Sequence, residues 1–164
     1  MLEIIVVVAI IGIVSAMTFP NIQEWLAKRR LQADYQTLVA KMQYLRLKAR
    51  TLPGSSRLQC TGNQVSATVN DANNALLESD PPAGSPASSL LHHPAQVLLT
   101  PCSASSISFA SDGSTSGTRE FFLHHSGDPA GARYGAYRLT LSGSTGFIRT
   151  YRLSPGASQW LETE

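Results

Sequence analysis

Charged residues are scarce in this chain, and this limits the partners that its overall charge would attract. Only 15% of the 164 residues are charged, and the formal net charge is +2. So mild a balance gives no long-range attraction to nucleic acid or to acidic partners. Seven of the thirteen Lys and Arg lie in the first fifty residues, whereas the remainder is rich in Ser, Gly, Thr and Pro. This asymmetry predicts a helical rod followed by a β-rich head.

The sequence motifs of catalysis and cofactor binding are absent. There is no GxSxG, no P-loop and no convincing pair of catalytic acids, so we expect no enzyme activity. No CxxCH occurs, which argues against covalently attached haem, and we expect no cofactor. The pairs His92-His93 and His124-His125 border turn-like stretches without a carboxylate at a recognisable spacing. We therefore expect no metal site at either pair.

Cysteine is also rare. Cys60 and Cys102 are too few and too far apart for a CxxC metal or redox motif. For a head that lies outside the cytoplasm, one structural disulfide that closes a loop of about forty residues is the favoured interpretation. Two buried free thiols are the alternative.

A long apolar run opens the chain, MLEIIVVVAIIGIVSAMTFP, interrupted near its start by Glu3. Its length is close to the roughly 20 residues that cross a hydrocarbon core. No basic region precedes it, and the helical pattern continues past Pro20, so we predict a retained transmembrane segment and not a cleaved signal peptide. An interior helix of a soluble protein is the alternative.

The pattern after Pro20 indicates an amphipathic helix. The apolar residues follow steps of four and three, at Leu31, Tyr35, Leu38, Met42, Leu45, Ala49 and Leu52. This stripe predicts a helix packed along a head. Pro53-Gly54 ends the helix, and bends or local melting are expected at Gly12 and Pro20.

Short runs bounded by turn residues follow Gly54 and indicate strands. The predicted strands are Arg57–Cys60, Gln64–Val69, Gln96–Leu99, Ser106–Ala110, Arg119–His124, Gly135–Leu141 and Phe147–Leu153. The last two form the clearest hairpin, around SGSTG. The stretch from Asn70 to Pro94 is predicted to be a long polar loop. We thus expect an α+β fold with three parts: an apolar helix half at 1–20, an amphipathic half at 21–53 and a β-rich head at 54–164.

Glu3 is the most unusual residue of the apolar run. An acid inside an apolar helix is a functional candidate by default. The alternative is an acid that lies at the membrane interface, or one that is stabilised by the dipole at the N-terminus of its own helix. The run LEIIVVVAIIGIVSAMTFPNIQ resembles the N-terminus of type IV pilins and type II secretion pseudopilins. Their mature chains carry a Glu near the start and a Pro seventeen residues later, and Glu3 and Pro20 have this interval.

The resemblance implies a type IV pilin-like fold, with one antiparallel sheet packed on the helix. It also implies that Glu3 pairs with the N-terminal ammonium of a neighbouring subunit and sets subunit register. Ile4, Gly12 and Pro20 belong to the same assembly segment. The implied partners are copies of this chain or other pilins in a helical filament, a prepilin peptidase and the assembly machinery. The implied location is a single pass in a bacterial inner membrane and then an extracellular or periplasmic filament, although Lys28, Arg29 and Arg30 taken alone place that flank in the cytoplasm.

The head is similar to one subgroup. ISFASDGSTSG and AYRLTLSGSTGFIRTYRL resemble H-type pseudopilins and the T- and U-type minor pilins. A repeating shaft subunit and a low-copy tip or priming subunit both remain open. Some T-type minor pilins hold DNA with basic residues of the head, so Arg133, Arg138, Arg149 and Arg152 are candidate DNA-binding residues, with an ordinary solvated face as the alternative. A membrane-anchored binding domain that never polymerises is a further alternative.

Overall fold

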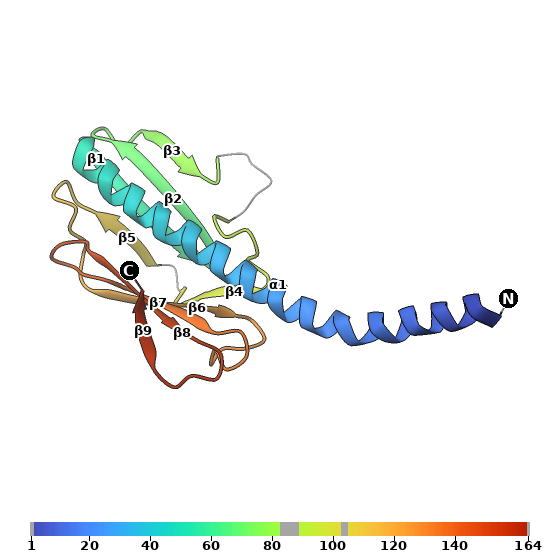
Figure 1. Cartoon of the computed structure of the whole chain (residues 1–164). Helices are drawn as coiled ribbons and strands as arrows, with labels where there is room; N and C mark the ends of the chain where they lie inside the picture. Colours follow the sequence, from blue (N-terminus) through green and yellow to red (C-terminus); the bar gives the residue numbers. More distant parts are fainter. Residues whose placement is uncertain (1, 83–88, 103–104, 164) are drawn as a thin grey trace.

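The computed structural model describes the chain except for residues 1, 83–88, 103–104 and 164, and except for the side chains of residues 2 and 16–21. Within the described ranges, one long helix, α1 (Leu2–Thr51), is followed by nine strands. The C-terminal half of α1 lies along a β head, and the N-terminal half projects away from it (Figure 1). The α+β class predicted from the sequence is confirmed, as is the long N-terminal helix.

The head contains two antiparallel sheets, whereas we had expected one. The strands are β1 (Gly54–Thr61), β2 (Gln64–Asp71), β3 (Leu76–Asp80), β4 (Val97–Thr100), β5 (Ser105–Phe109), β6 (Arg119–His125), β7 (Ala136–Leu141), β8 (Ile148–Leu153) and β9 (Trp160–Thr163). The first sheet has the order β3-β2-β1-β5, and the second has the order β4-β6-β7-β8-β9. All seven predicted strands are present with shifted ends, and β3 and β9 were missed. The predicted loop from Asn70 to Pro94 is wrong in part, because β3 lies inside it.

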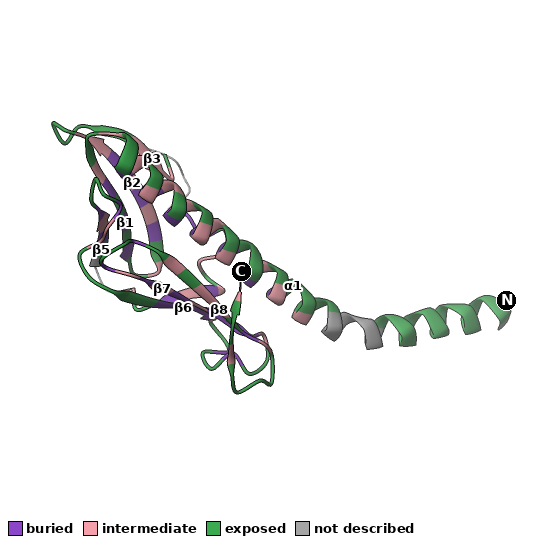
Figure 2. Cartoon of the chain, turned by 60° about the vertical axis from the view of Figure 1, so that its left-hand side comes forward, coloured by how far each residue is buried: buried purple, intermediate pink, exposed green. Residues whose placement is uncertain are grey.

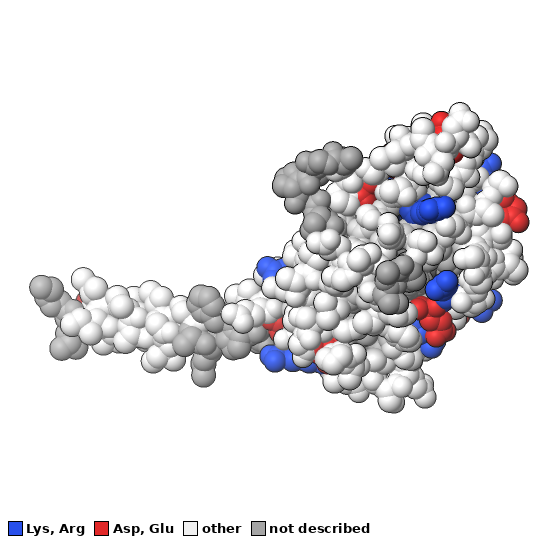
Figure 3. All heavy atoms as spheres, turned by 180° about the vertical axis from the view of Figure 1, so that it is seen from behind, with Lys and Arg blue, Asp and Glu red and all other residues white. Residues whose placement is uncertain are grey.

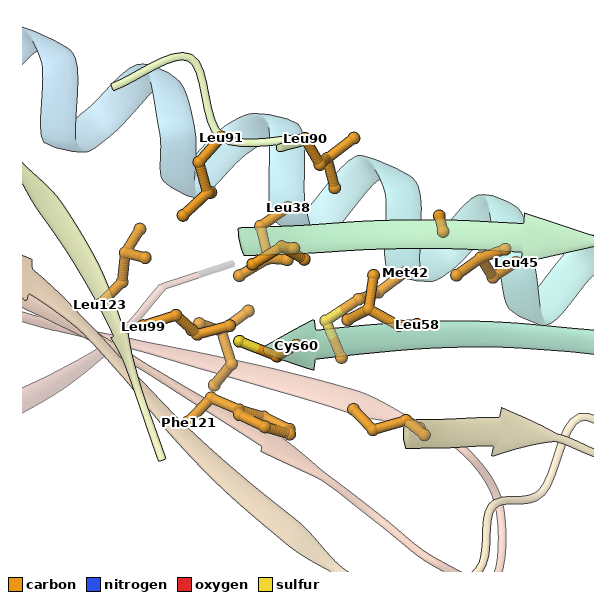
Figure 4. Packing of buried hydrophobic residues seen from close by; sticks show 14 of the residues in the cluster. Leu38, Met42, Leu45, Leu58, Cys60, Leu90, Leu91, Leu99, Phe121 and Leu123 are labelled. Atoms are coloured by element: carbon orange, nitrogen blue, oxygen red, sulfur yellow. The ribbon is translucent and has the colours of Figure 1, made fainter. Parts of the chain in front are cut away.

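The apolar stripe of α1 is the spine of the core. Its residues Leu31, Leu38, Met42, Leu45 and Ala49 are buried, and the partly buried Tyr35 and Leu52 pack on the same cluster. Figure 4 shows Leu38, Met42 and Leu45 of the helix facing Leu58 of β1 and Leu99 of β4. Both sheets therefore bury their inner faces against one helix face, which confirms the predicted packing of the stripe.

A disulfide and one turn connect the two sheets. Cys60 of β1 is bonded to Cys102, which lies just after β4, and their Cα atoms are 5.2 Å apart. The turn between β1 and β2 has positive φ angles at Gly62 and Asn63 (56° and 70°), as the favoured two-residue hairpin turn requires. The Asn63 side chain then donates to the Val97 carbonyl at 3.1 Å and accepts the Leu99 N–H at 3.0 Å. Strands from different sheets are thus cross-linked at one end of the head.

The helix ends where the sequence predicted. Its last residue is Thr51, two residues before Pro53, because the residue that precedes a proline is disfavoured in the helical region. The helical backbone is continuous across Gly12 and Pro20, so the expected melting is absent. The side chain of Pro20 lies outside the described residues. One unbroken helix therefore extends from the head core to Leu2.

Candidate assembly surface

The projecting part of α1 exposes apolar side chains on all its sides. Nine aliphatic residues there are between 48% and 69% exposed, namely Ile4, Ile5, Val6, Val7, Val8, Ile10, Ile11, Ile13 and Val14. We call these nine residues the aliphatic sleeve. Figure 2 shows the described residues of this part as exposed around the whole helix, in contrast to the half that lies on the head.

So much contiguous apolar surface indicates a site of interaction, because soluble chains seldom leave more than a few hundred Å² of it uncovered. An amphipathic helix needs one apolar partner face, whereas a helix that is apolar all round is normally surrounded. The aliphatic sleeve therefore requires partners on several sides.

Glu3 and Gly12 lie within this surface. Glu3 is exposed in the first turn of α1, where a carboxylate favours the helix dipole. Among the residues that the structure describes, no cation lies within ion-pair distance of Glu3. A Cβ atom built at Gly12 meets no atom within 4 Å. Both positions are thus open to contact by another molecule.

The predicted single pass through a bacterial inner membrane is contradicted. Over the part of the chain that the structure describes, no helix is long and apolar enough to cross a membrane. The sleeve from Ile4 to Val14 is about 16 Å long at 1.5 Å per residue, against a hydrocarbon core of about 30 Å. The prediction had counted apolar residues as far as Phe19, whose side chain lies outside the described residues.

Polar contacts at the neck, where α1 enters the head, fix the direction of the projecting helix. Glu24 Oε1 lies 2.7 Å from Lys28 Nζ, and Glu24 Oε2 lies 3.6 Å from Arg133 Nε. The hydrogen bond and charge of Lys28, with a smaller contribution from Arg133, lower the pKa of Glu24. Six residues after Glu24, Arg30 donates to the Gln96 side chain at 2.6 Å. The exposed helix is therefore tied to the head on both sides of its entry point.

Asp34 is the most buried ionisable group of the neck, and the sequence analysis missed it. Its side chain is fully buried, and its two oxygens accept the backbone N–H groups of His92 (2.9 Å) and His93 (3.2 Å). The Nδ1 atoms of both imidazoles lie within 3.6 Å of the same carboxylate. The only sequence signal was an acid three residues after Leu31, on the apolar stripe. Asp34 binds the segment before β4 to the helix.

Asp128 performs a similar task in the head and was also missed. Its carboxylate accepts the N–H groups of Ala132, Arg133 and Tyr134 at 2.7 to 3.0 Å. Burial opposes ionisation, but these hydrogen bonds outweigh it, so the pKa of Asp128 is lowered. The turn-forming run DPAG is the sequence signal that could have identified it. Asp128 shapes the loop that presents Arg133 to Glu24.

The two histidine pairs have structural partners. His92 and His93 flank Asp34, and the ring of His125 lies 4.4 Å from that of Tyr134. Burial lowers the pKa of His125, although the charge of Asp128 opposes this effect. Within the described ranges, no group of three or more His, Cys, Asp or Glu is placed to hold a metal ion.

The four candidate DNA-binding arginines are not brought together. Arg138 and Arg149 line one groove of the second sheet, but Arg152 pairs with Tyr137 and lies on the helix-facing side. Arg133 is engaged at the neck by Glu24. On the face seen in Figure 3, the Lys and Arg side chains are scattered and do not form one patch.

Comparison with known proteins adds nothing to these observations: no family model, no curated protein and no solved structure matches the chain.

Proposed function

We propose that this chain is a structural subunit of a helical, type IV pilin-like filament, assembled through the projecting half of α1. The observation that carries the proposal is the aliphatic sleeve, which is exposed on every side of a helix that the head leaves uncovered. Copies of the same helix are the simplest partner, because each presents the same apolar surface and the same length.

The energetics favour a bundle of such helices. Burying an aliphatic side chain completely stabilises by about 1.5 to 3 kcal/mol, so nine partly exposed residues offer on the order of 10 kcal/mol per subunit. This is comparable to the estimated entropic cost of association, about 4 to 15 kcal/mol. Contacts between heads then decide how firmly the filament holds together.

The fixed neck gives the assembly its geometry. Because Glu24, Arg30 and Asp34 tie α1 to the head, the packing of helices at the centre sets the position of each head at the periphery. By the sequence resemblance, Glu3 pairs with the amino terminus of an adjacent subunit and fixes the axial register, since an unpaired carboxylate in an apolar core is costly.

Cysteine cross-linking tests the proposal directly. Both natural cysteines are in the disulfide, so one engineered thiol reports one position. We expect a long, flexible bis-maleimide to join Ile10→Cys chains into covalent dimers in assembled material, because like positions of neighbouring helices in a helical filament are offset along its axis and lie beyond the reach of a direct disulfide. Leu47→Cys is the matched control, because Leu47 is equally exposed on the same helix but lies beside the head. Equal cross-linking at both positions, or none at Ile10→Cys, contradicts assembly through the sleeve.

A further inference from the structure

A groove on the head gathers three arginines from three different elements. Arg46 comes from α1, Arg138 from β7 and Arg149 from β8, and they line a hollow of about 620 Å³. This volume falls within the range of small-molecule sites, about 300 to 1,000 Å³. We call this hollow the arginine groove. None of its lining residues belongs to the aliphatic sleeve.

Strand register places Arg138 and Arg149 on the same face. Arg138 is opposite Tyr151, and Thr140 is opposite Arg149, so the two arginines are diagonal neighbours about 7 to 8 Å apart. The Arg138 guanidinium lies 4.3 Å from the centre of the Tyr151 ring and 5.3 Å from that of Trp160. Arg138 is thus held in position by aromatic rings, with its planar donors available to a ligand.

Two arginine donors of this groove lack an acceptor. The Nε atoms of Arg46 and Arg138 are buried and have no hydrogen-bond partner among the described residues. Arg46 is otherwise held by the Thr145 carbonyl, at 2.9 Å from one terminal nitrogen. A buried donor without a partner is rare in folded proteins. Both side chains also line the hollow, so the guanidinium ends of these arginines are the donors that can reach an acceptor-bearing ligand there.

The charges around the arginine groove select an anion. Three arginines face one acid, Glu120. Two other hollows of similar size, about 600 and 630 Å³, have no such surplus. One is lined by Lys41 together with two acids. The other adjoins the arginine groove and contains Arg149 itself together with one acid, Glu162.

The uncharged residues of the groove narrow the class of anion. Five hydroxyl side chains line it, those of Thr118, Thr140, Ser142, Thr145 and Tyr151. Phe147, at 54% exposed, offers an apolar face. Glu120 repels a dense polyphosphate but accepts hydrogen bonds from ligand hydroxyls. A sugar with one carboxylate suits these side chains: its hydroxyls can bond to Glu120 and the hydroxyl groups, and its ring can lie on Phe147. Its carboxylate suits the arginines, because arginine binds carboxylates through paired hydrogen bonds.

We propose that the arginine groove binds a uronic acid unit of an acidic polysaccharide. The carboxylate is held by Arg138 and Arg149, the hydroxyls by Glu120 and the Thr and Ser side chains, and the ring by Phe147. A filament of such subunits presents one site per head, so weak single contacts combine into firm attachment.

Calorimetric titration of the full chain in non-ionic detergent with trigalacturonate tests this assignment. We expect Arg149→Gln to weaken binding by about tenfold or more, since it removes one charge-assisted contact. Arg149 is exposed, so this variant leaves the fold intact. Arg138→Gln is expected to have a similar effect, with near-ultraviolet circular dichroism as the check on its fold. Arg152→Gln is the matched control, an exposed arginine of the same strand on the opposite face, and we expect it to bind as the unaltered chain does.

Three results overturn the assignment. The first is no binding of trigalacturonate up to about 10 mM, the weak limit of a specific site. The second is equal binding of the methyl-esterified probe, which has lost its carboxylates. The third is tighter binding of a single-stranded oligonucleotide than of the sugar, with that binding lost when Arg138 or Arg149 is replaced. Such a result would make nucleic acid the ligand of the groove. Cross-linking at Ile10→Cys is independent of these measurements, so failure of the site is distinguishable from failure of assembly.

Discussion

Replacing Asp34 with alanine is expected to loosen the head at the neck. The carboxylate is fully buried and accepts one backbone N–H on each oxygen, from His92 and from His93. In Asp34→Ala both N–H groups lose their acceptor, and the methyl group that replaces the carboxylate fills less space. The segment that carries Leu90 and Leu91 into the core is then no longer bound to α1.

The size of the effect follows from these two contacts. A hydrogen bond to a charged group contributes about 1.5 to 3 kcal/mol, so we expect the loss of both to lower the free energy of unfolding by about 3 to 6 kcal/mol. For a chain of this length, each kcal/mol lowers the melting temperature by about 2 to 4 °C, so a decrease of about 10 °C is predicted.

Thermal unfolding of the full chain in non-ionic detergent, followed by near-ultraviolet circular dichroism at pH 7, measures this loss. Asp34→Asn is the informative companion, because its amide oxygen still accepts one N–H while its NH₂ group faces backbone donors. We expect it to be less damaging than alanine. A decrease below about 2 °C for Asp34→Ala, less than 1 kcal/mol, would show that this buried carboxylate does not hold the neck.

Three further predictions concern the disulfide, the core and the loop at Asp128. Replacing both Cys60 and Cys102 with alanine opens a loop of 42 residues. We expect this to lower the free energy of unfolding, measured by urea titration, by about 4 kcal/mol. An unchanged urea midpoint contradicts this. Leu45 is fully buried, so Leu45→Ala should lower the free energy of unfolding by about 2 to 5 kcal/mol in the same titration. The side chain of Leu47 is 60% exposed, so Leu47→Ala should change this free energy by less than about 0.5 kcal/mol. Because the pKa of Asp128 is lowered on folding, its contribution is present above the ordinary value of 3.8 and is lost as the pH falls through the lower folded value. The stability difference between the unaltered chain and Asp128→Asn should therefore be constant near neutral pH and shrink below pH 3.8, and a difference that grows in acid refutes this assignment.

The sequence was most informative where one local period governs the structure. The stripe from Leu31 to Leu52 has the period of a helix, and Pro53 marks its end. Strands with clear alternation and turns at both ends, such as β7 and β8, were also predictable. β3 was missed because it lies at a sheet edge with exposed Leu76 and Leu77, so it has no alternation of buried and exposed residues.

What the sequence could not supply depends on pairing between distant segments. The division into two sheets follows from the order of strands, which no local pattern encodes. Asp34 finds its partners 58 and 59 residues away. The separation of Arg152 from Arg138 and Arg149 is a consequence of strand register, because one residue of shift moves a side chain to the other face.

Electron microscopy of filaments tests the central claim most directly. Cells that produce the chain, or its Glu3→Ala variant, are imaged with an antibody against the head. Assembly through α1 predicts filaments that carry the label, with helices packed at the centre and heads outside, and fewer or no filaments in the variant. Label that never occurs on a filament, with the chain remaining as single subunits, would contradict the proposal.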